Sequence, residues 1–356
     1  MDTEYLLYVV IGLIFLAILI ITFMMTGSKS SSEKTGTQNL MEYTKVISLS
    51  PLGSSTDKLC DFYIASSAYS VFPSYTTGDY ISEKMIPLVI KAGARLIELD
   101  IYDGGNKPVV GLKNESLGFD YAKNSVDLES CFVALGNSAF NKLDTPLSSD
   151  PFILSLMFHT ENTNILNASS QLLKDILGRF LLGPEYAYHR KNLSQEPIDN
   201  LKGKLIIVSG GSIKHTKMEE FVNLSWSTSS LRRLTYMQAS QPHDHEELIE
   251  SNKKSICMVI PDPDPDLKNS NPTILFSYGC QWNLMNYGSL DMMMELNIEK
   301  FQQASLVLKP SELRYKPSIL KTPVLSDPQT HSFQPMMHTS PIYDTNSTTG
   351  DKSIVV

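Results

Sequence analysis

The chain has 356 residues, enough for one large domain or two of ordinary size. Its net charge of −8, without a long run of Lys and Arg, argues against nucleic-acid binding and against attachment to anionic lipid by charge alone. Hydrophobic residues make up 42% of the chain, which suffices for a substantial core. The cysteines (Cys60, Cys131, Cys257 and Cys280) are widely spaced, so we expect reduced, buried thiols rather than disulfides or a zinc site.

Residues 6–25 form an uncharged, mostly apolar run of about twenty residues, long enough to cross a bilayer as a helix. A secretory signal peptide is the alternative, but the N-terminus is acidic and no cleavage site follows the run. Lys29 and Lys34 lie just beyond it, which predicts a single-pass anchor with the body on the cytosolic side of a viral or host membrane. Asn-x-Ser/Thr sequons point to the opposite side; they begin at Asn114, Asn167, Asn192, Asn223 and Asn346.

Composition divides the chain into an N-terminal transmembrane anchor (1–26), a flexible stalk (27–40), a folded body (41–317) and a disordered tail (318–356). Strand patterns in the body lie at 61–66, 94–101, 108–112, 152–158, 204–208, 231–237, 255–260 and 281–287. Helical patterns alternate with them at 82–92, 128–135, 170–181, 245–252 and 292–303. This alternation predicts one α/β fold, a parallel TIM-type (β/α)8 barrel, rather than two small domains.

Two carboxylates stand near the end of the predicted strand at 94–101. Because side chains alternate along a strand, Glu98 and Asp100 project to the same face, about 6.5 Å apart. Burying carboxylates without partners is costly, so the pair indicates a cation, a basic partner or a wet cleft. Two interpretations stay open: a residual cation site, or a structural ion pair with a lysine, for which Lys113 is the first candidate.

Short motifs are spread over residues 61–314. In the first half they are Tyr63-Ile64-Ala65-Ser66-Ser67, Thr77-Gly78-Asp79, the segment 97–104, Pro108-Val109-Val110, the segment 151–156 and Leu201-Lys202-Gly203-Lys204. In the second half they are Ile260-Pro261, Gly279-Cys280-Gln281 and the segment 306–313. Their order and spacing resemble the X and Y regions of the eukaryotic-type phosphoinositide-specific phospholipase C family, with the long linker between X and Y missing. The resemblance implies a TIM-type barrel, which agrees with the strand pattern.

The resemblance also implies a chemistry, the calcium-assisted attack of an inositol hydroxyl on the adjacent phosphodiester. It implies one catalytic histidine at the position of Ala68 and a second at that of Leu112. It further implies a clamp for the lipid headgroup, but Val208, Met258 and Ile260 stand at those positions. Both histidines and the clamp are therefore expected to be missing.

The calcium ligands implied by the family are expected to be incomplete as well. Glu98 and Asp100 are kept, whereas Tyr69 and Met157 replace an asparagine and a glutamate. Since calcium takes six to eight oxygen ligands, we expect a weak Ca²⁺ site or none, and no required cofactor. His159 is a candidate to rescue catalysis; the alternative is a structural or solvent-facing histidine.

Two acidic tracts have simpler interpretations. Asp262, Asp264 and Asp266 alternate with prolines, which favours an extended, solvated loop over a calcium loop. The tract His243-Asp244-His245-Glu246 is typical of the first turn of a helix, where acidic residues are favourable.

These departures predict a membrane-anchored, phospholipase C-like barrel that has lost its activity and acts as a binding or scaffold protein. The alternative is an active, metal-assisted phosphoric diester hydrolase that uses Glu98, Asp100 and His159 on a phosphatidylinositol-type lipid. A third hypothesis is binding of a phospholipid headgroup without cleavage. The expected partners are the membrane, such a headgroup or another protein, and no nucleic acid.

Overall fold

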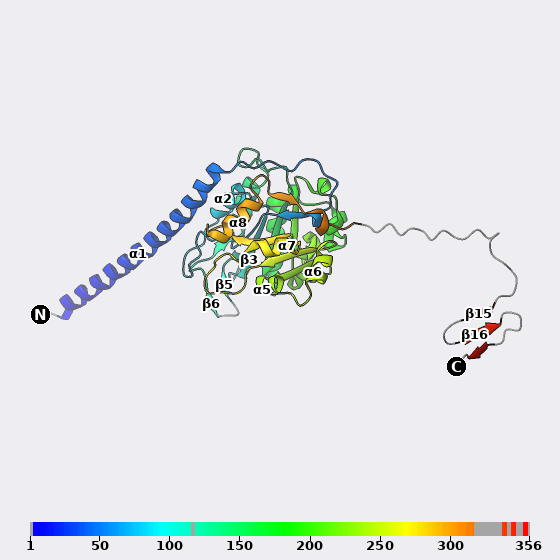
Figure 1. Ribbon diagram of the computed structural model, residues 1–356. Coiled ribbons are helices and arrows are strands. Elements are labelled where there is room, and N and C mark those ends of the chain that lie inside the picture. Colours follow the sequence, from blue (N-terminus) through cyan, green and yellow to red (C-terminus); the bar gives the residue numbers. More distant parts are fainter. Residues whose placement is uncertain (1–2, 115–117, 317–336, 340–342, 347–351, 355–356) are drawn as a thin grey trace. The chain divides into compact units, whose positions relative to one another are not determined.

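The computed structural model describes the chain except for residues 1–2, 115–117, 317–336, 340–342, 347–351 and 355–356 (Figure 1). The described residues fall into two units, the first ending at Tyr315 and the second beginning at Lys316.

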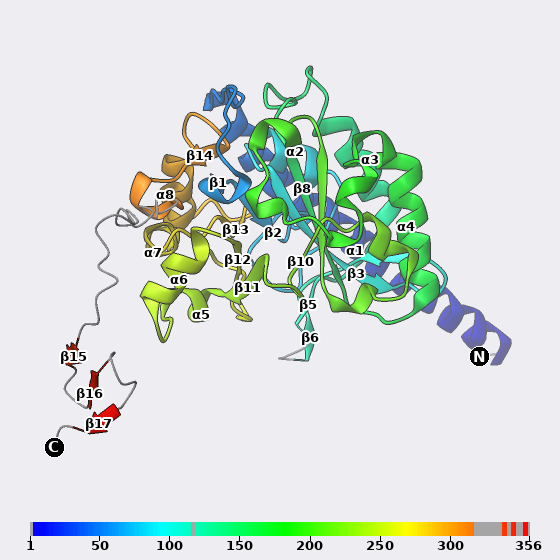
Figure 2. The same ribbon diagram turned by 90° about the vertical axis from the view of Figure 1, so that its right-hand side faces the viewer.

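Eight parallel strands form the centre of the first unit, counted over the described residues (Figure 2). In sheet order they are β10 (Leu224–Ser225), β9 (Leu205–Ser209), β8 (Phe152–Phe158), β3 (Leu96–Asp103), β2 (Ser66–Ala68), β13 (Trp282–Asn286), β12 (Ile256–Ile260) and β11 (Leu231–Thr235). Each strand is parallel to its neighbours. Within the described part of the chain β10 and β11 do not pair with each other, so the barrel is nearly closed. The predicted TIM-type barrel is confirmed, whereas the transmembrane helix predicted with it is not supported by the described residues.

The strand expected at 108–112 is not a barrel strand, which corrects the prediction. It forms β4 (Pro108–Val110), which pairs antiparallel with the end of β3, while β7 (Val126–Asp127) pairs with β4. The eighth place in the barrel belongs to β10, which pairs with β9. A strand of two residues is too short to show an alternation pattern, so it could not be found from the sequence.

Two further pairs of short strands lie outside the barrel. β1 (Phe62–Ile64) is antiparallel to β14 (Leu306–Leu308), which joins the beginning and the end of the unit. β5 (Lys113–Asn114) is antiparallel to β6 (Phe119–Asp120) and forms a hairpin.

The helices of the barrel largely follow the predicted pattern. They are α2 (Met85–Lys91), α3 (Leu128–Ser138), α4 (Thr163–Leu177), α5 (Tyr236–Ser240), α6 (His245–Asn252), α7 (Pro272–Ser277) and α8 (Met292–Lys300). The strand predicted to reach residue 237 ends at Thr235 because the Thr235 side chain accepts from the backbone N–H of Gln238 and starts α5. Asp244 accepts from the backbone N–H of Glu247 and starts α6, which confirms the helical interpretation of that tract.

Side chains on the two faces of the barrel strands form two separate cores. Ile97 and Leu99 on β3 belong to the core between strands and helices. Leu96 belongs to the second core, which fills the barrel and includes Trp282. Glu98 and Asp100 alternate with Ile97 and Leu99 and so share one face of β3, as predicted; the structure shows that this face is the barrel interior. The four cysteines are free and buried.

The first helix is longer than the sequence suggests. α1 (Thr3–Val46) continues through residues 27–40, where composition predicts a flexible stalk. That expectation was wrong because the end of the helix is packed: Leu40 is buried in the first core, and Gly36 lies against Pro73. No helix meets the length and apolarity needed to span a membrane, among the residues whose structure is described.

The second unit includes the whole of the expected tail. Its described residues form β15 (Met337–Thr339), β16 (Tyr343–Asn346) and β17 (Lys352–Ile354), which pair antiparallel in sequence order. Thr339, Tyr343, Thr345 and Ile354 are residue types that favour strands, which the composition of the tail obscures. The rest of the segment expected to be disordered lies outside the described residues.

Candidate functional site

A pocket lies at the carboxyl ends of the barrel strands, where catalytic sites of such barrels are found. Its open volume is about 900 Å³, including solvent at the mouth. It is lined by Ala68, Tyr69, Glu98, Asp100, Leu112, Lys113, Asn114, Tyr121, Met157, His159, Arg233, Thr235, Ile260, Pro261 and Pro263. Glu98, Asp100 and His159, which the sequence singled out, are therefore brought together.

Both oxygens of Glu98 have partners. Arg233 Nη2 donates to Glu98 Oε1 at 2.8 Å, and Ser155 Oγ donates to Glu98 Oε2 at 2.8 Å. The Glu98 side chain is 8% exposed and that of Arg233 16%, so this is a largely buried ion pair. Burial raises the pKa of the Glu98 carboxyl, and the nearby Asp100 acts in the same direction, while Arg233 and Ser155 act to lower it.

Reasoning from the sequence missed Arg233, which lies on β11. Its guanidinium carbon lies 4.9 Å from the ring centre of Trp226, so the two side chains form a cation–π contact. The neighbouring Arg232 points to the other side of the strand and donates two hydrogen bonds to Glu247, at 3.0 and 2.7 Å. The sequence did contain a pattern that could have indicated Arg233: of two consecutive arginines in a barrel strand, one must face the interior.

The lysine expected to neutralise Glu98 does not do so. Lys113 lies on the hairpin strand β5, where its Nζ is 3.8 Å from Asp120 Oδ1 and 5.4 Å from the ring centre of Tyr102. Its place at the pocket rim leaves it half exposed to solvent. Of the two open interpretations, the geometry favours the structural ion pair, but its cation is Arg233 and not a lysine.

Asp100 and His159 form a second pair beside the first. His159 Nε2 lies 2.8 Å from Asp100 Oδ1, and both side chains are mostly buried. The imidazole stacks on the Tyr102 ring, with centroids 4.5 Å apart and planes within 5°. His159 thus has a fixed position next to the carboxylate, and it is not solvent-facing.

Four other residues that the resemblance singled out also line the pocket. Ala68 and Leu112 are each 3% exposed and form apolar wall. Tyr69 has a left-handed backbone, with φ of 50°, and its ring centre lies 6.3 Å from that of Tyr121. Burial raises the pKa of Tyr69, so its phenol is neutral. Met157 stands beside Asp100 on the neighbouring strand.

The positions of the expected headgroup clamp lie mostly below the pocket. Val208 and Met258 are fully buried in the core of the barrel, and only Ile260 reaches the pocket wall. None of these side chains can donate a hydrogen bond to a phosphate.

These residues do not fit a calcium ion. Glu98 is held by Arg233 and Ser155, Asp100 is held by His159, and Met157 offers no oxygen. No group of three or more His, Cys, Asp or Glu that suits a metal occurs within the described residues. The residual cation site proposed for Glu98 and Asp100 is therefore not supported by the geometry.

The acidic loop after β12 is held by backbone contacts. Both Asp262 carboxylate oxygens accept from the Met237 N–H, the Asp264 carbonyl accepts from the Tyr121 hydroxyl, and Asp266 pairs with Lys268. These contacts tie the loop to α5 and to Tyr121.

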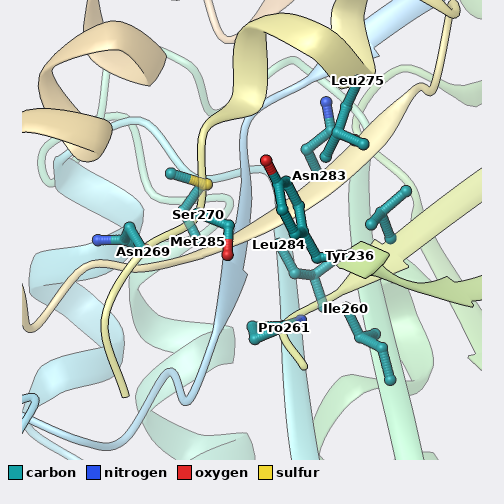
Figure 3. A pocket seen from close by; sticks show the side chains of 10 residues that line it. Tyr236, Ile260, Pro261, Asn269, Ser270, Leu275, Asn283, Leu284 and Met285 are labelled. Atoms are coloured by element: carbon teal, nitrogen blue, oxygen red, sulfur yellow. The ribbon is translucent and has the colours of Figure 1, made fainter. Parts of the chain in front are cut away.

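A smaller hollow of about 280 Å³ lies beside the main pocket and shares Ile260 and Pro261 with it. Figure 3 shows Tyr236, Asn283 and Met285 around it. Asn283 is buried and its Oδ1 has no hydrogen-bond partner within the described residues. Apolar side chains form much of the wall, so this hollow offers no reactive group.

Comparison with known proteins agrees with the fold. Residues 55–210 match the family described as phosphatidylinositol-specific phospholipase C, X domain. This stretch of the chain is thus similar to the X domain of phosphatidylinositol-specific phospholipase C. No curated protein sequence matches the chain.

Solved structures of phospholipase C extend the similarity in fold beyond the X domain. PLC21 of S. officinalis is 20% identical with a TM-score of 0.62, and PLC21 of L. pealei is 19% identical with a TM-score of 0.62. Each match covers 74% of this chain and 39% of the other. The chain thus spans about two fifths of the length of these proteins. A calcium-dependent phosphoinositol-specific phospholipase C from Pseudomonas sp. is 13% identical, with a TM-score of 0.49, over 68% of this chain and 95% of that one.

Proposed function

We propose that this phospholipase C-like barrel is a pseudoenzyme that binds a ligand or partner without cleaving a phosphodiester. One observation carries the proposal: the carboxylate of Glu98, a calcium ligand by resemblance, already has a hydrogen-bond donor on each oxygen, from Arg233 and from Ser155. A calcium ion would have to break an ion pair that is largely shielded from water.

The walls of the pocket support the same conclusion. Removing a positioned acid–base group lowers a rate by about 10²–10⁴. Two such groups would be lost if Ala68 and Leu112 stand where the family has histidines. The clamp positions Val208 and Met258 are buried and apolar, so a multiply charged headgroup finds no donors there.

The Asp100–His159 pair favours a second candidate function, an active phosphoric diester hydrolase with rebuilt chemistry. A histidine that is oriented by a carboxylate can act as a general base. In this alternative Glu98, Asp100 and His159 would act on a phosphatidylinositol-type lipid. Such a hydrolase would act in lipid metabolism or in signal transduction.

Attachment to a membrane by the N-terminal segment stays a prediction. What supports it is the exposure of apolar side chains along α1, from Val10 to Met24. Placement of the body on the cytosolic side also stays a prediction: of the sequon asparagines, Asn114 and Asn223 are 5% exposed and hydrogen-bonded within the fold, whereas Asn192 is exposed. A buried asparagine cannot carry a glycan.

A phosphodiesterase assay on the full chain in mild detergent tests the proposal. Phosphatidylinositol micelles and a soluble chromogenic diester would each be offered with calcium and with chelator. We expect no turnover above that of Glu98→Gln under any condition. Turnover that is lost in His159→Ala would establish the hydrolase instead.

Ligand binding without cleavage needs a separate measurement. Calorimetric titration with a soluble inositol phosphate probes the pocket without the contribution of α1 to lipid binding. Saturable binding that is weakened in Arg233→Met would identify a headgroup site, whereas no binding would favour a protein partner.

A further inference from the structure

We propose that the guanidinium of Arg233 is a built-in replacement for a metal cation, so that the barrel mouth excludes divalent ions and works without them. The inference goes beyond the proposed function, because it concerns what occupies the carboxylates and not whether a diester is cleaved. It begins from a charge that the sequence pattern left unexplained: two carboxylates on one face of β3 need a cation.

The ion pair crosses the barrel. Glu98 lies on β3 and Arg233 on β11, and β2, β13 and β12 separate these strands in the sheet order. The two residues are 135 positions apart in the sequence. Arg233 therefore reaches from the second half of the chain to the interior carboxylate of the first half, as a metal held in the barrel would do.

The surroundings fix the guanidinium in that place. Trp226 covers one side of it at 4.9 Å, and Ser155 occupies the second oxygen of Glu98. The indole of Trp226 in turn lies close against the backbone of Gly210, so close that a Cβ at Gly210 would clash with the indole nitrogen. A planar guanidinium suits such a stacked, largely buried pair better than a lysine does.

The second carboxylate has its own partner. Asp100 is bound by His159, which stacks on Tyr102. A divalent ion between Glu98 and Asp100 would displace both partners and would lie next to the positive charge of Arg233. Met157, on the strand beside Asp100, supplies no oxygen to compensate.

Calcium binding to the full chain tests this inference. Wild-type protein, Glu98→Gln, Arg233→Met and Arg233→Met/Glu98→Gln would be compared by calorimetry and by melting temperature in millimolar calcium and in chelator. Arg232→Met is the matched control, because Arg232 is the neighbouring arginine with its own carboxylate partner outside the barrel.

We expect no saturable calcium binding by wild type or Arg232→Met. Arg233→Met should gain binding, with a rise in melting temperature of about 2–4 °C in calcium, and the added Glu98→Gln should abolish it. If Arg233→Met does not fold in chelator, it should fold when calcium is present.

Three results would overturn the inference. One is saturable calcium binding by wild type that Glu98→Gln removes. Another is a folded Arg233→Met that does not respond to calcium. The third is an Arg233→Met that fails to fold with and without calcium. Each readout is independent of turnover, so an inactive barrel with a working calcium site would refute this inference and leave the pseudoenzyme proposal standing.

Discussion

Breaking the Arg233–Glu98 pair should destabilise the barrel far more than breaking the surface pair beside it. Substituting Arg233 by Met leaves Glu98 buried with Ser155 as its remaining partner. Removing one member of a buried ion pair costs about 3–5 kcal/mol. Because the Arg233 side chain is 16% exposed and water can reach Glu98 once it is gone, we expect the lower end, about 3 kcal/mol.

A double-mutant cycle isolates the interaction. Glu98→Gln, Arg233→Met and the double variant would be unfolded with urea and followed by circular dichroism. The double variant should be more stable than the sum of the single losses predicts, with a coupling free energy of about 2 kcal/mol. The Arg232–Glu247 pair on the same strand is 38% and 53% exposed, so Arg232→Met should cost less than about 1 kcal/mol.

The outcome of this cycle decides whether the buried pair organises the barrel mouth. If Arg233→Met were as mild as Arg232→Met, or if the two changes at Glu98 and Arg233 were additive, the pair would have no such role. Loss of signal from the β-sheet in Arg233→Met alone, with recovery in the double variant, would support it strongly.

Other variants test the packing and titration of neighbouring regions. Burial lowers the pKa of Lys309 to about 8, whereas a lysine in the unfolded chain has a pKa of about 10.4. Between these two values the unfolded chain binds one proton more than the folded protein, so stability rises with pH. The free energy of unfolding of wild type, relative to that of Lys309→Met, should therefore rise by about 1 kcal/mol per pH unit from pH 8 to about 10. A pH-independent difference in urea denaturation would contradict this. Gly210→Ala should cost about 1–3 kcal/mol, because its Cβ would clash with Trp226 behind Arg233. Gly178→Ala is the control, because Gly178 has a helical φ of −52° and an added Cβ there would meet no neighbour within 4 Å. This variant should be neutral or more stable than wild type by about 0.4–1 kcal/mol. Equal melting temperatures of the two alanine variants would refute the role of the Gly210–Trp226 contact.

Much of the barrel could be predicted because its strands are long enough to carry a pattern. The alternation in β3 correctly placed Glu98 and Asp100 on one shared face of the strand. The segment that forms β4 was wrongly predicted to be a barrel strand, because a short apolar segment has the same composition whether it joins the barrel or folds back on β3. The helical course of residues 27–40 depends on the packing of Leu40, which local composition does not contain.

The site could be predicted only in part, for a related reason. Proximity in sequence favoured Lys113 as the partner of Glu98, but the hairpin carries Lys113 to the rim. Arg233 meets Glu98 only because the barrel brings β11 opposite β3. Such a pairing follows from strand order and register, and neither can be obtained from a local pattern.

Whether Arg233 takes the place of a metal can be decided by a crystal structure of the protein grown in millimolar calcium. Anomalous diffraction would locate any calcium ion at the barrel mouth. We expect Arg233 Nη2 within hydrogen-bond distance of Glu98 and no calcium between Glu98 and Asp100. A calcium ion bound to both carboxylates, with the guanidinium displaced, would show that the barrel mouth is a metal site after all.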